Sequence, residues 1–277
     1  MKSLVFIVLI SVVFAGTTQA QHYYTDLLVT RDNSKKQASF KLNKVKAVRF
    51  ASFDMYNQPI EGFSCNMKLS SNFMEITTNT KAPAAGESEN SSFFNASGQL
   101  IKSTDTSEGN KTVITYAYDA ENRITNITSI ASSPGNYINK EEHIWSYDQQ
   151  GRPSKMLKIK NGSDTTYISF VIDEQGNVAE EKSVHARQEQ STVYYYYNDK
   201  HQLTDIVRYN NRAKRLLPDY IFEYKGDNLA SMLVTTEGGA DYQKWNYFYD
   251  DRGLKVKDEC YSKTRVLIGK IEYSYQF

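Results

Sequence analysis

The sequence predicts an all-β fold: an antiparallel meander of about 16–18 strands, made of tandem β-hairpin repeats of about 26 residues and rolled into a barrel-like or flattened cocoon. Three observations support this prediction. An anchor residue recurs at a nearly constant spacing, the residues before each anchor alternate between apolar and polar, and residues typical of turns follow it.

Each repeat is marked by an aromatic or large apolar anchor that is usually followed by Asp or Asn. Recurrence at a fixed period is the signature of a repeat architecture. From the second anchor onward the spacing is 24–29 residues, whereas the first spacing is 41. The anchors are Phe53, Phe94, Tyr118, Tyr147, Ile172, Tyr197, Tyr224, Tyr249 and Tyr275.

The internal pattern of a repeat is that of a hairpin. Ahead of an anchor, alternation of period two indicates a strand, as at Trp245, Tyr247 and Tyr249. After the anchor, Asp or Asn can bond its own backbone two residues on, and a Gly such as Gly151 suits a left-handed turn. A returning strand and a second turn complete the period, so each repeat corresponds to one hairpin.

The number of strands predicts closure of the sheet. Consecutive hairpins are expected to pair edge to edge. Open sheets seldom exceed ~10 strands before they curl or split, so a sheet of this size is expected to roll up with its aromatic anchor face buried. Both a closed barrel and a flattened cocoon satisfy this expectation.

The N-terminal region fits the repeat less well. Residues 53–59 match residues 147–153 in type, so a repeat is predicted there. The segment near 80–92, with Pro83 and Gly86, is predicted to be a flexible insertion. Residues 23–30 are predicted to add a further strand, and no helix of useful length is expected.

The first twenty residues have the pattern of a signal peptide. Lys2 precedes an apolar run from Leu4 to Ala15, and small residues stand at positions 18 and 20. The run is shorter than the ~20 residues that a membrane-spanning helix needs. We therefore predict a signal peptide over 1–20 and a single repeat domain over 21–277, exported to the periplasm, the outer cell surface or the extracellular space.

The balance of charges excludes one class of partner. The chain has 33 basic and 32 acidic residues, a formal net charge of +1. Without a basic field, no nucleic-acid partner is expected. Membrane insertion is not expected either, because charged residues such as those of 180–182 and 255–259 fill the return strands.

The segment Tyr147-Asp148-Gln149-Gln150-Gly151-Arg152 resembles the YD repeat of Rhs-type proteins, in which Tyr-Asp is followed by two variable residues, Gly-Arg and an apolar residue. The resemblance covers roughly residues 45–277, in particular to short, secreted, repeat-only proteins of Gram-negative bacteria. It implies the β-hairpin fold. Most repeats lack the Gly-Arg step, and the chain is too short for the toxin-enclosing shell of the large Rhs proteins, so the resemblance leaves the function open.

No group of residues in the sequence predicts catalysis, a cofactor or a metal site. None of the four histidines has the spacing of paired metal ligands, and the nucleotide-binding and hydrolase motifs do not occur. The recurrent carboxylates stand at equivalent turns and are interpreted as turn-forming residues. They are Asp119, Asp148, Asp173 and Asp250.

Two pairs of side chains are candidate functional residues. Tyr194 and Tyr196 point away from the buried face of their strand, so they are candidates for contact with a ligand. Cys65 and Cys260 stand at similar heights in the first and last full hairpins. They are either free buried thiols or a disulfide, and a disulfide requires Cα atoms within ~7 Å and a meeting of the chain's two ends.

These observations favour an exported, non-enzymatic protein. It either binds a partner, which is a glycan or another cell-surface protein, or serves as a structural component of the cell surface. One alternative is glycan binding through exposed aromatic residues. The other is an outer-membrane β-barrel pore, because Ile271, Tyr273, Tyr275 and Phe277 alternate up to the C-terminus as in the last strand of such barrels.

Overall fold

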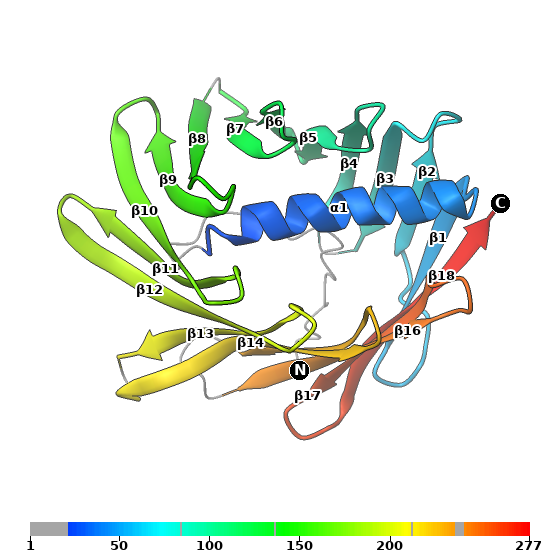
Figure 1. Ribbon diagram of the computed structural model, residues 1–277. Helices are drawn as coiled ribbons and strands as arrows, with labels where there is room; N and C mark the ends of the chain where they lie inside the picture. The colour runs from blue at the N-terminus through cyan, green and yellow to red at the C-terminus, as the bar shows by residue number, and fades with distance from the viewer. Residues whose placement is uncertain (1–21, 84, 136, 212, 236–240) are drawn as a thin grey trace.

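The computed structural model describes residues 22–277 except 84, 136, 212 and 236–240. Eighteen strands form one antiparallel sheet, and the first strand pairs with the last. The sheet is therefore a closed barrel (Figure 1). The predicted fold class is confirmed, including the meander and the strand count, and the barrel is the form of closure that the chain adopts.

Apart from one helix, the elements follow one another around the barrel in chain order. The strands are β1 (Ala47–Asp54), β2 (Ser64–Leu69), β3 (Glu75–Ala82), β4 (Gly86–Phe94), β5 (Leu100–Ser107), β6 (Asn110–Tyr118), β7 (Ile124–Ser133), β8 (Tyr137–Tyr147), β9 (Pro153–Lys160), β10 (Asp164–Ile172), β11 (Val178–His185), β12 (Gln188–Tyr197), β13 (Leu203–Asn210), β14 (Arg215–Lys225), β15 (Asn228–Thr235), β16 (Tyr242–Tyr249), β17 (Lys255–Ser262) and β18 (Leu267–Gln276).

Closure of the barrel brings the two ends of the sheet into tight contact. β1 pairs with β18 over eight positions, from Ala47 opposite Gln276 to Asp54 opposite Gly269. A side chain at position 269 would place its Cβ 2.8 Å from the backbone oxygen of Phe53. Glycine is therefore required there, because any Cβ would force the two strands apart.

Helix α1 (Thr25–Leu42) is the main departure from the predicted fold, and the strand predicted over 23–30 is wrong. The helix crosses the interior of the barrel (Figure 1). Asp26 in its first turn and Lys41 in its last turn suit the helix dipole. Lys44, with φ of 56°, ends the helix and turns the chain into β1.

The region near 80–92 also differs from the prediction. It forms the paired hairpin of β3 and β4 rather than an inserted loop. The turn after Phe53 has the predicted local geometry, because the carboxylate of Asp54 accepts the N–H groups of Tyr56 and Gln58 at 2.9 Å. The 41-residue spacing that follows contains three strands instead of two, so this turn lies at the rim opposite the other anchor turns.

The recurrent aspartates form turns as predicted. The carboxylate of Asp148 accepts the N–H groups of Gln150 and Arg152 at 2.9 Å, and its second oxygen accepts the Arg152 side chain. These hydrogen bonds hold the pKa of Asp148 below its usual value. The carboxylates of Asp119, Asp173 and Asp250 accept the backbone N–H groups two and four residues on in the same way.

The anchor tyrosines join each hairpin to the one before it. The hydroxyl of Tyr147 donates to the carbonyl oxygen of Ile124 at 2.7 Å, across the β7–β8 pair. Ile124 is the first residue of the preceding return strand. The same bond joins Tyr118 to Leu100, Tyr197 to Val178, Tyr224 to Leu203, Tyr249 to Leu229 and Tyr275 to Lys255. We call this bond the tyrosine latch.

Replacement of Tyr147 by Phe is expected to lower the free energy of unfolding by about 1 kcal/mol, because the Ile124 carbonyl loses its partner while the ring stays in place. Thermal unfolding monitored by circular dichroism measures the change. The control is Tyr196→Phe on the outer face, which is expected to leave the midpoint unchanged. If wild type, Tyr147→Phe and Tyr196→Phe had the same midpoint of thermal unfolding, a stabilising role for the latch would be contradicted.

Candidate functional site

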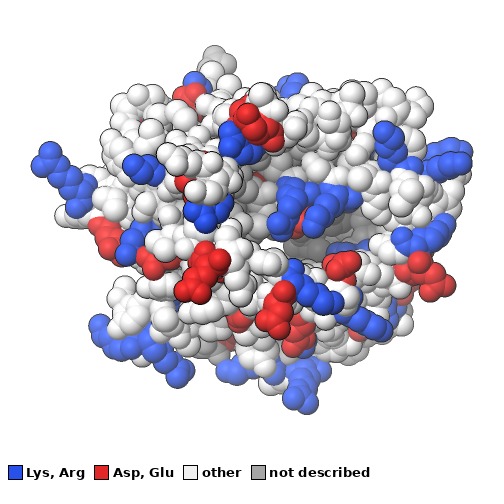
Figure 2. Space-filling view, in the orientation of Figure 1, with Lys and Arg blue, Asp and Glu red and all other residues white. Residues whose placement is uncertain are grey.

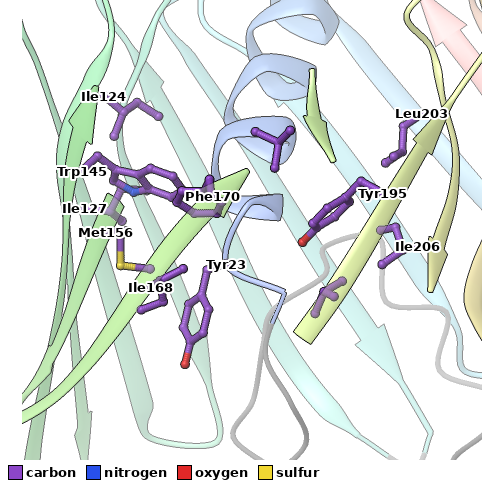
Figure 3. Packing of buried hydrophobic residues seen from close by; sticks show 12 residues of the cluster. Tyr23, Ile124, Ile127, Trp145, Met156, Ile168, Phe170, Tyr195, Leu203 and Ile206 are labelled. Atoms are coloured by element: carbon purple, nitrogen blue, oxygen red, sulfur yellow. The ribbon is translucent and has the colours of Figure 1, made fainter. Parts of the chain in front are cut away.

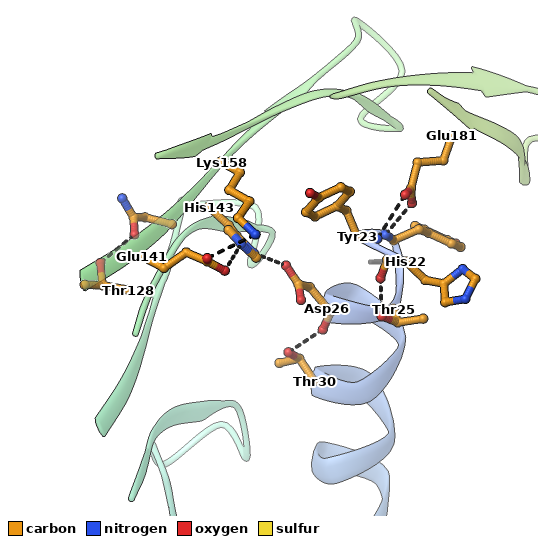
Figure 4. A network of polar contacts seen from close by, with 12 residues as sticks. His22, Tyr23, Thr25, Asp26, Thr30, Thr128, Glu141, His143, Lys158 and Glu181 are labelled. Atoms are coloured by element: carbon orange, nitrogen blue, oxygen red, sulfur yellow. Dashed lines mark hydrogen bonds and ion pairs between the residues drawn. The ribbon is translucent and has the colours of Figure 1, made fainter. Parts of the chain in front are cut away.

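The start of α1 is held by a buried carboxylate from the barrel wall. Glu181 of β11 is 1% exposed, and its two oxygens accept the backbone N–H groups of Tyr23 at 3.0 Å and Tyr24 at 2.8 Å (Figure 4). The Tyr195 hydroxyl donates a third hydrogen bond at 2.8 Å. Burial outweighs these three bonds and raises the pKa of Glu181 to about 7.

A second buried network joins α1 to β8 and β9. The ring of His143 lies between two carboxylates, with Nδ1 2.6 Å from Asp26 and Nε2 3.0 Å from Glu141. Lys158 lies 3.0 Å from the other oxygen of Glu141. Burial disfavours the charged ring, but the charges and hydrogen bonds of Asp26 and Glu141 outweigh it and raise the pKa of His143 to about 9.

A third network holds the residue that precedes the helix. His22 is buried, and its Nε2 lies 3.4 Å from the carboxylate of Asp219. Arg208 donates to the same carboxylate, with Nη2 3.0 Å from Oδ1. Burial lowers the pKa of His22 to about 4, so the ring is neutral at neutral pH.

These networks position the helix. The bonded neighbours of the His143 ring are the carboxylates of Asp26 and Glu141 rather than a nucleophile, and they favour the protonated ring. Within the part of the chain that the structure describes, no group of three His, Cys, Asp or Glu side chains has the geometry of a metal site.

Two apolar clusters pack against the two ends of the helix. The first packs Tyr23, Tyr24 and Leu27 against the inner faces of β6–β14, where Trp145 stacks on Phe170 at 5.3 Å (Figure 3). The second packs the C-terminal part of α1 and the segment after it against β1–β5, β17 and β18. The predicted burial of the aromatic anchor face is thereby confirmed.

The inner wall of the barrel is not buried evenly. Six inward residues of β14, β15 and β16 are only partly buried, whereas inward residues of β8–β12 such as Trp145 and Tyr195 are fully buried. Figure 2 shows Lys and Arg side chains gathered where α1 crosses the barrel. We call the six inward residues of β14, β15 and β16 the β14–β16 wall; they are Tyr220, Phe222, Met232, Val234, Trp245 and Tyr247.

Charged groups lie beside this wall. The ammonium of Lys255 lies 4.2 Å from the ring centre of Tyr247 and 3.3 Å from Oδ2 of Asp258. Asp258 is buried, and its Oδ1 has no hydrogen-bond partner. Burial, together with the nearby charge of Lys255, lowers the pKa of Lys36 on α1 to about 8.

The candidate residues from the sequence lie elsewhere. Tyr194 and Tyr196 are on the outer face of β12, where Tyr194 is half-buried and Tyr196 is 48% exposed. Cys65 and Cys260 are buried free thiols. The ends of the chain do meet, but β1 and β18 separate the two cysteines, so the disulfide is not formed. The sequence pattern did not indicate the β14–β16 wall, because its residues follow the same alternation as buried ones.

Comparisons with known proteins agree with the repeat. Residues 94–133, from the end of β4 to the end of β7, match the family model RHS Repeat, so the resemblance to YD repeats is confirmed in this segment. No protein with a curated description matches the chain.

Three solved structures are similar at low identity. A porin-like protein from Bacteroides uniformis ATCC 8492 is 10% identical with a TM-score of 0.40, and one from Bacteroides vulgatus ATCC 8482 is 14% identical with a TM-score of 0.30. A putative 6-phosphogluconolactonase from Bacteroides fragilis NCTC 9343 is 8% identical with a TM-score of 0.20. Each match covers 84% of this chain and 98% of the other.

Replacement of His143 by Gln is expected to destabilise the protein in a pH-dependent way. The folded pKa of about 9 exceeds the ordinary 6.5, so the stabilisation by the charged ring is complete below pH 6.5 and is lost as the pH rises through 9. The difference in free energy of unfolding between wild type and variant is therefore expected to shrink by about 3 kcal/mol between pH 6 and pH 10.

Urea unfolding at both pH values measures this difference. His201→Asn is the control, because His201 lies exposed at the rim and Asn tolerates its positive φ of 57°. A difference for His143→Gln that stays constant from pH 6 to pH 10 would show that the ring is not held in the charged form.

Proposed function

We propose that this chain is an exported, non-enzymatic β-barrel that works in water as a binding protein. The observation that carries the proposal is the distribution of side chains across the wall of the barrel. Apolar and aromatic residues face inward around α1, and charged residues face outward.

The outward residues form ion pairs along the strands. Glu180 and Lys182 flank the buried Glu181 and lie 2.9 Å apart. Likewise, Lys257 pairs with Glu259 at 2.7 Å and Lys270 with Glu272 at 2.6 Å, on either side of buried residues. An outer face built in this way is suited to contact with water.

This arrangement favours a binding protein over an outer-membrane pore. Membrane barrels carry an apolar band on the outside and a polar lumen, and a Lys or Arg on the lipid face costs ~2–4 kcal/mol at mid-bilayer. Here apolar clusters lie in the interior around α1, and ion pairs such as Glu180–Lys182 lie on the outer face. Separately, among the described residues no helix is long and apolar enough to cross a membrane.

A second candidate is binding of glycans on the outer face, and one observation favours it. Tyr196 presents a ring that is 48% exposed on β12, with Tyr194 on the same face. Exposed aromatic faces of this kind can stack on sugar rings. A glycan array probed with wild type and with Tyr196→Ala distinguishes this candidate, because only specific binding through Tyr196 would be lost in the variant.

Expression of the full-length chain in a Gram-negative host tests the main proposal. We expect the protein to be recovered without detergent as a β-rich monomer in size-exclusion chromatography, with its N-terminus at Gln21 by mass spectrometry. Recovery only from the membrane fraction with detergent would contradict the proposal and favour the outer-membrane barrel.

A further inference from the structure

We propose that the outer face of β12–β14 docks a basic segment of a partner protein: an extended stretch in which one Lys or Arg is followed by apolar side chains. The inference rests on the proposed binding function, since it names a surface and a partner class for it. The surface combines an unpaired negative charge, an open aromatic ring and a strip of exposed apolar side chains.

Outward phenylalanines of this barrel are covered by its own lysines. Three of them stand directly opposite a lysine on the neighbouring strand, and in each pair the ammonium lies over the ring, 4.2, 4.3 or 5.4 Å from its centre. A cation in this position is attracted by the negative face of the ring. The pairs are Phe248 and Lys257, Phe53 and Lys270, and Phe93 and Lys102.

Tyr196 of β12 departs from this arrangement. Its side chain is 48% exposed, and the residue directly opposite it on β13 is Asp205 instead of a lysine. Among the described residues, no cation lies over the Tyr196 ring, and no hydrogen bond or ion pair engages the Asp205 carboxylate. Lys182 of β11, on the same face, is bound to Glu180 at 2.9 Å. The ring and the carboxylate therefore form a site for a cation that comes from outside the chain.

Apolar side chains continue beside this pair on the same face of β12–β14. The cross-strand register places them in successive rows. They are Ile221 beside Asp205, then Tyr194, Val207 and Pro218, and then Tyr209 and Leu216. Tyr209 and Leu216 are 52% and 44% exposed. Contiguous exposed apolar side chains mark interaction surfaces, and tyrosine is enriched at protein–protein interfaces.

Shape and charge favour a protein segment as the occupant. Small-molecule sites are concave, whereas these side chains stand on the outward face of a sheet. Side chains two residues apart in an extended chain are separated by roughly 7 Å, as are the rows of the strip. A Lys or Arg placed between Tyr196 and Asp205 would therefore bring apolar side chains two and four residues later onto the next rows. A neutral sugar would leave the charge of Asp205 uncompensated.

A matched pair of peptides tests the charge of the partner. The probes are the acetylated and amidated pentapeptides Arg-Ser-Leu-Ser-Leu and citrulline-Ser-Leu-Ser-Leu, since citrulline keeps the shape of arginine without its charge. Titration of the ¹⁵N-labelled protein at pH 7 and low salt is expected to shift the amide resonances of β12–β14. The arginine peptide is expected to bind about fivefold more tightly, from one exposed ion pair and one cation–π contact.

Substitutions then locate the site. Asp205→Asn is expected to remove the preference for arginine, so that both peptides bind with the weaker affinity. Tyr196→Ala is expected to weaken both peptides, whereas Tyr196→Phe keeps the ring and is expected to bind as wild type does. Glu89→Gln is the matched control, because Glu89 is an exposed outward carboxylate of β4 whose cross-strand neighbours, Asn79 and Thr106, carry no ring.

Each other outcome would overturn the inference. Equal or tighter binding of the citrulline peptide would reject the cation. Shifts confined to other strands, or a preference for arginine that survives in Asp205→Asn, would place the site elsewhere. Shifts of β12–β14 caused by maltohexaose and by neither peptide would indicate a glycan site instead. No response of a soluble monomer to any of these probes would reject the surface and leave the proposed exported barrel standing.

Discussion

The tyrosine latch is the interaction on which the rest of the structure depends. Each anchor hydroxyl reaches back to a carbonyl at the start of the preceding return strand, as Tyr147 does to Ile124. Because the bond recurs at the same height in successive hairpins, it fixes their register and keeps the anchor rings on one side of the sheet. Six of the nine anchors make it, and the three that lack a hydroxyl are Phe53, Phe94 and Ile172. A sheet that turns its rings inward over eighteen strands then encloses an interior too wide for wall side chains to fill.

Helix α1 fills much of that interior, and its polar sequence explains the buried charges. A helix rich in Lys, Asp and Asn can lie inside an apolar barrel only if its polar groups meet partners. Glu181 accepts the N–H groups ahead of the first turn, and His143 and Asp219 bond Asp26 and His22. Buried ion pairs add little net stability against apolar packing, but loss of one partner is costly, so such groups favour a single position. In this protein they fix the start of the helix, and the residues just before it, against β8, β11 and β14.

Local patterns in the sequence predicted the strands, their number, the turns and the burial of the anchor face. They did not predict α1, because its apolar residues follow no single helical stripe and its surroundings differ along its length.

Glu181 stands between Glu180 and Lys182, so its charge suggested a surface position, although alternation placed it inward. Its partners Tyr23 and Tyr24 are about 158 residues away in the chain, and only closure of the barrel brings them together. The turn after Phe53 was predicted correctly. It lies at the rim opposite the other anchor turns, because three strands rather than two lead from it to the next anchor.

The central claim is that α1 buries the inner face of β8–β12 around Trp145 more completely than the inner face of β14–β16 around Trp245. The chain has two tryptophans, and they report on the two sides: Trp145 is 4% exposed in the cluster under α1, and Trp245 is partly exposed on the β14–β16 wall. The most direct measurement is acrylamide quenching of fluorescence in two single-tryptophan variants, Trp145→Phe and Trp245→Phe. The account predicts a quenching constant several-fold larger for Trp245 than for Trp145. Equal constants would contradict it, because α1 would then bury both faces to the same extent.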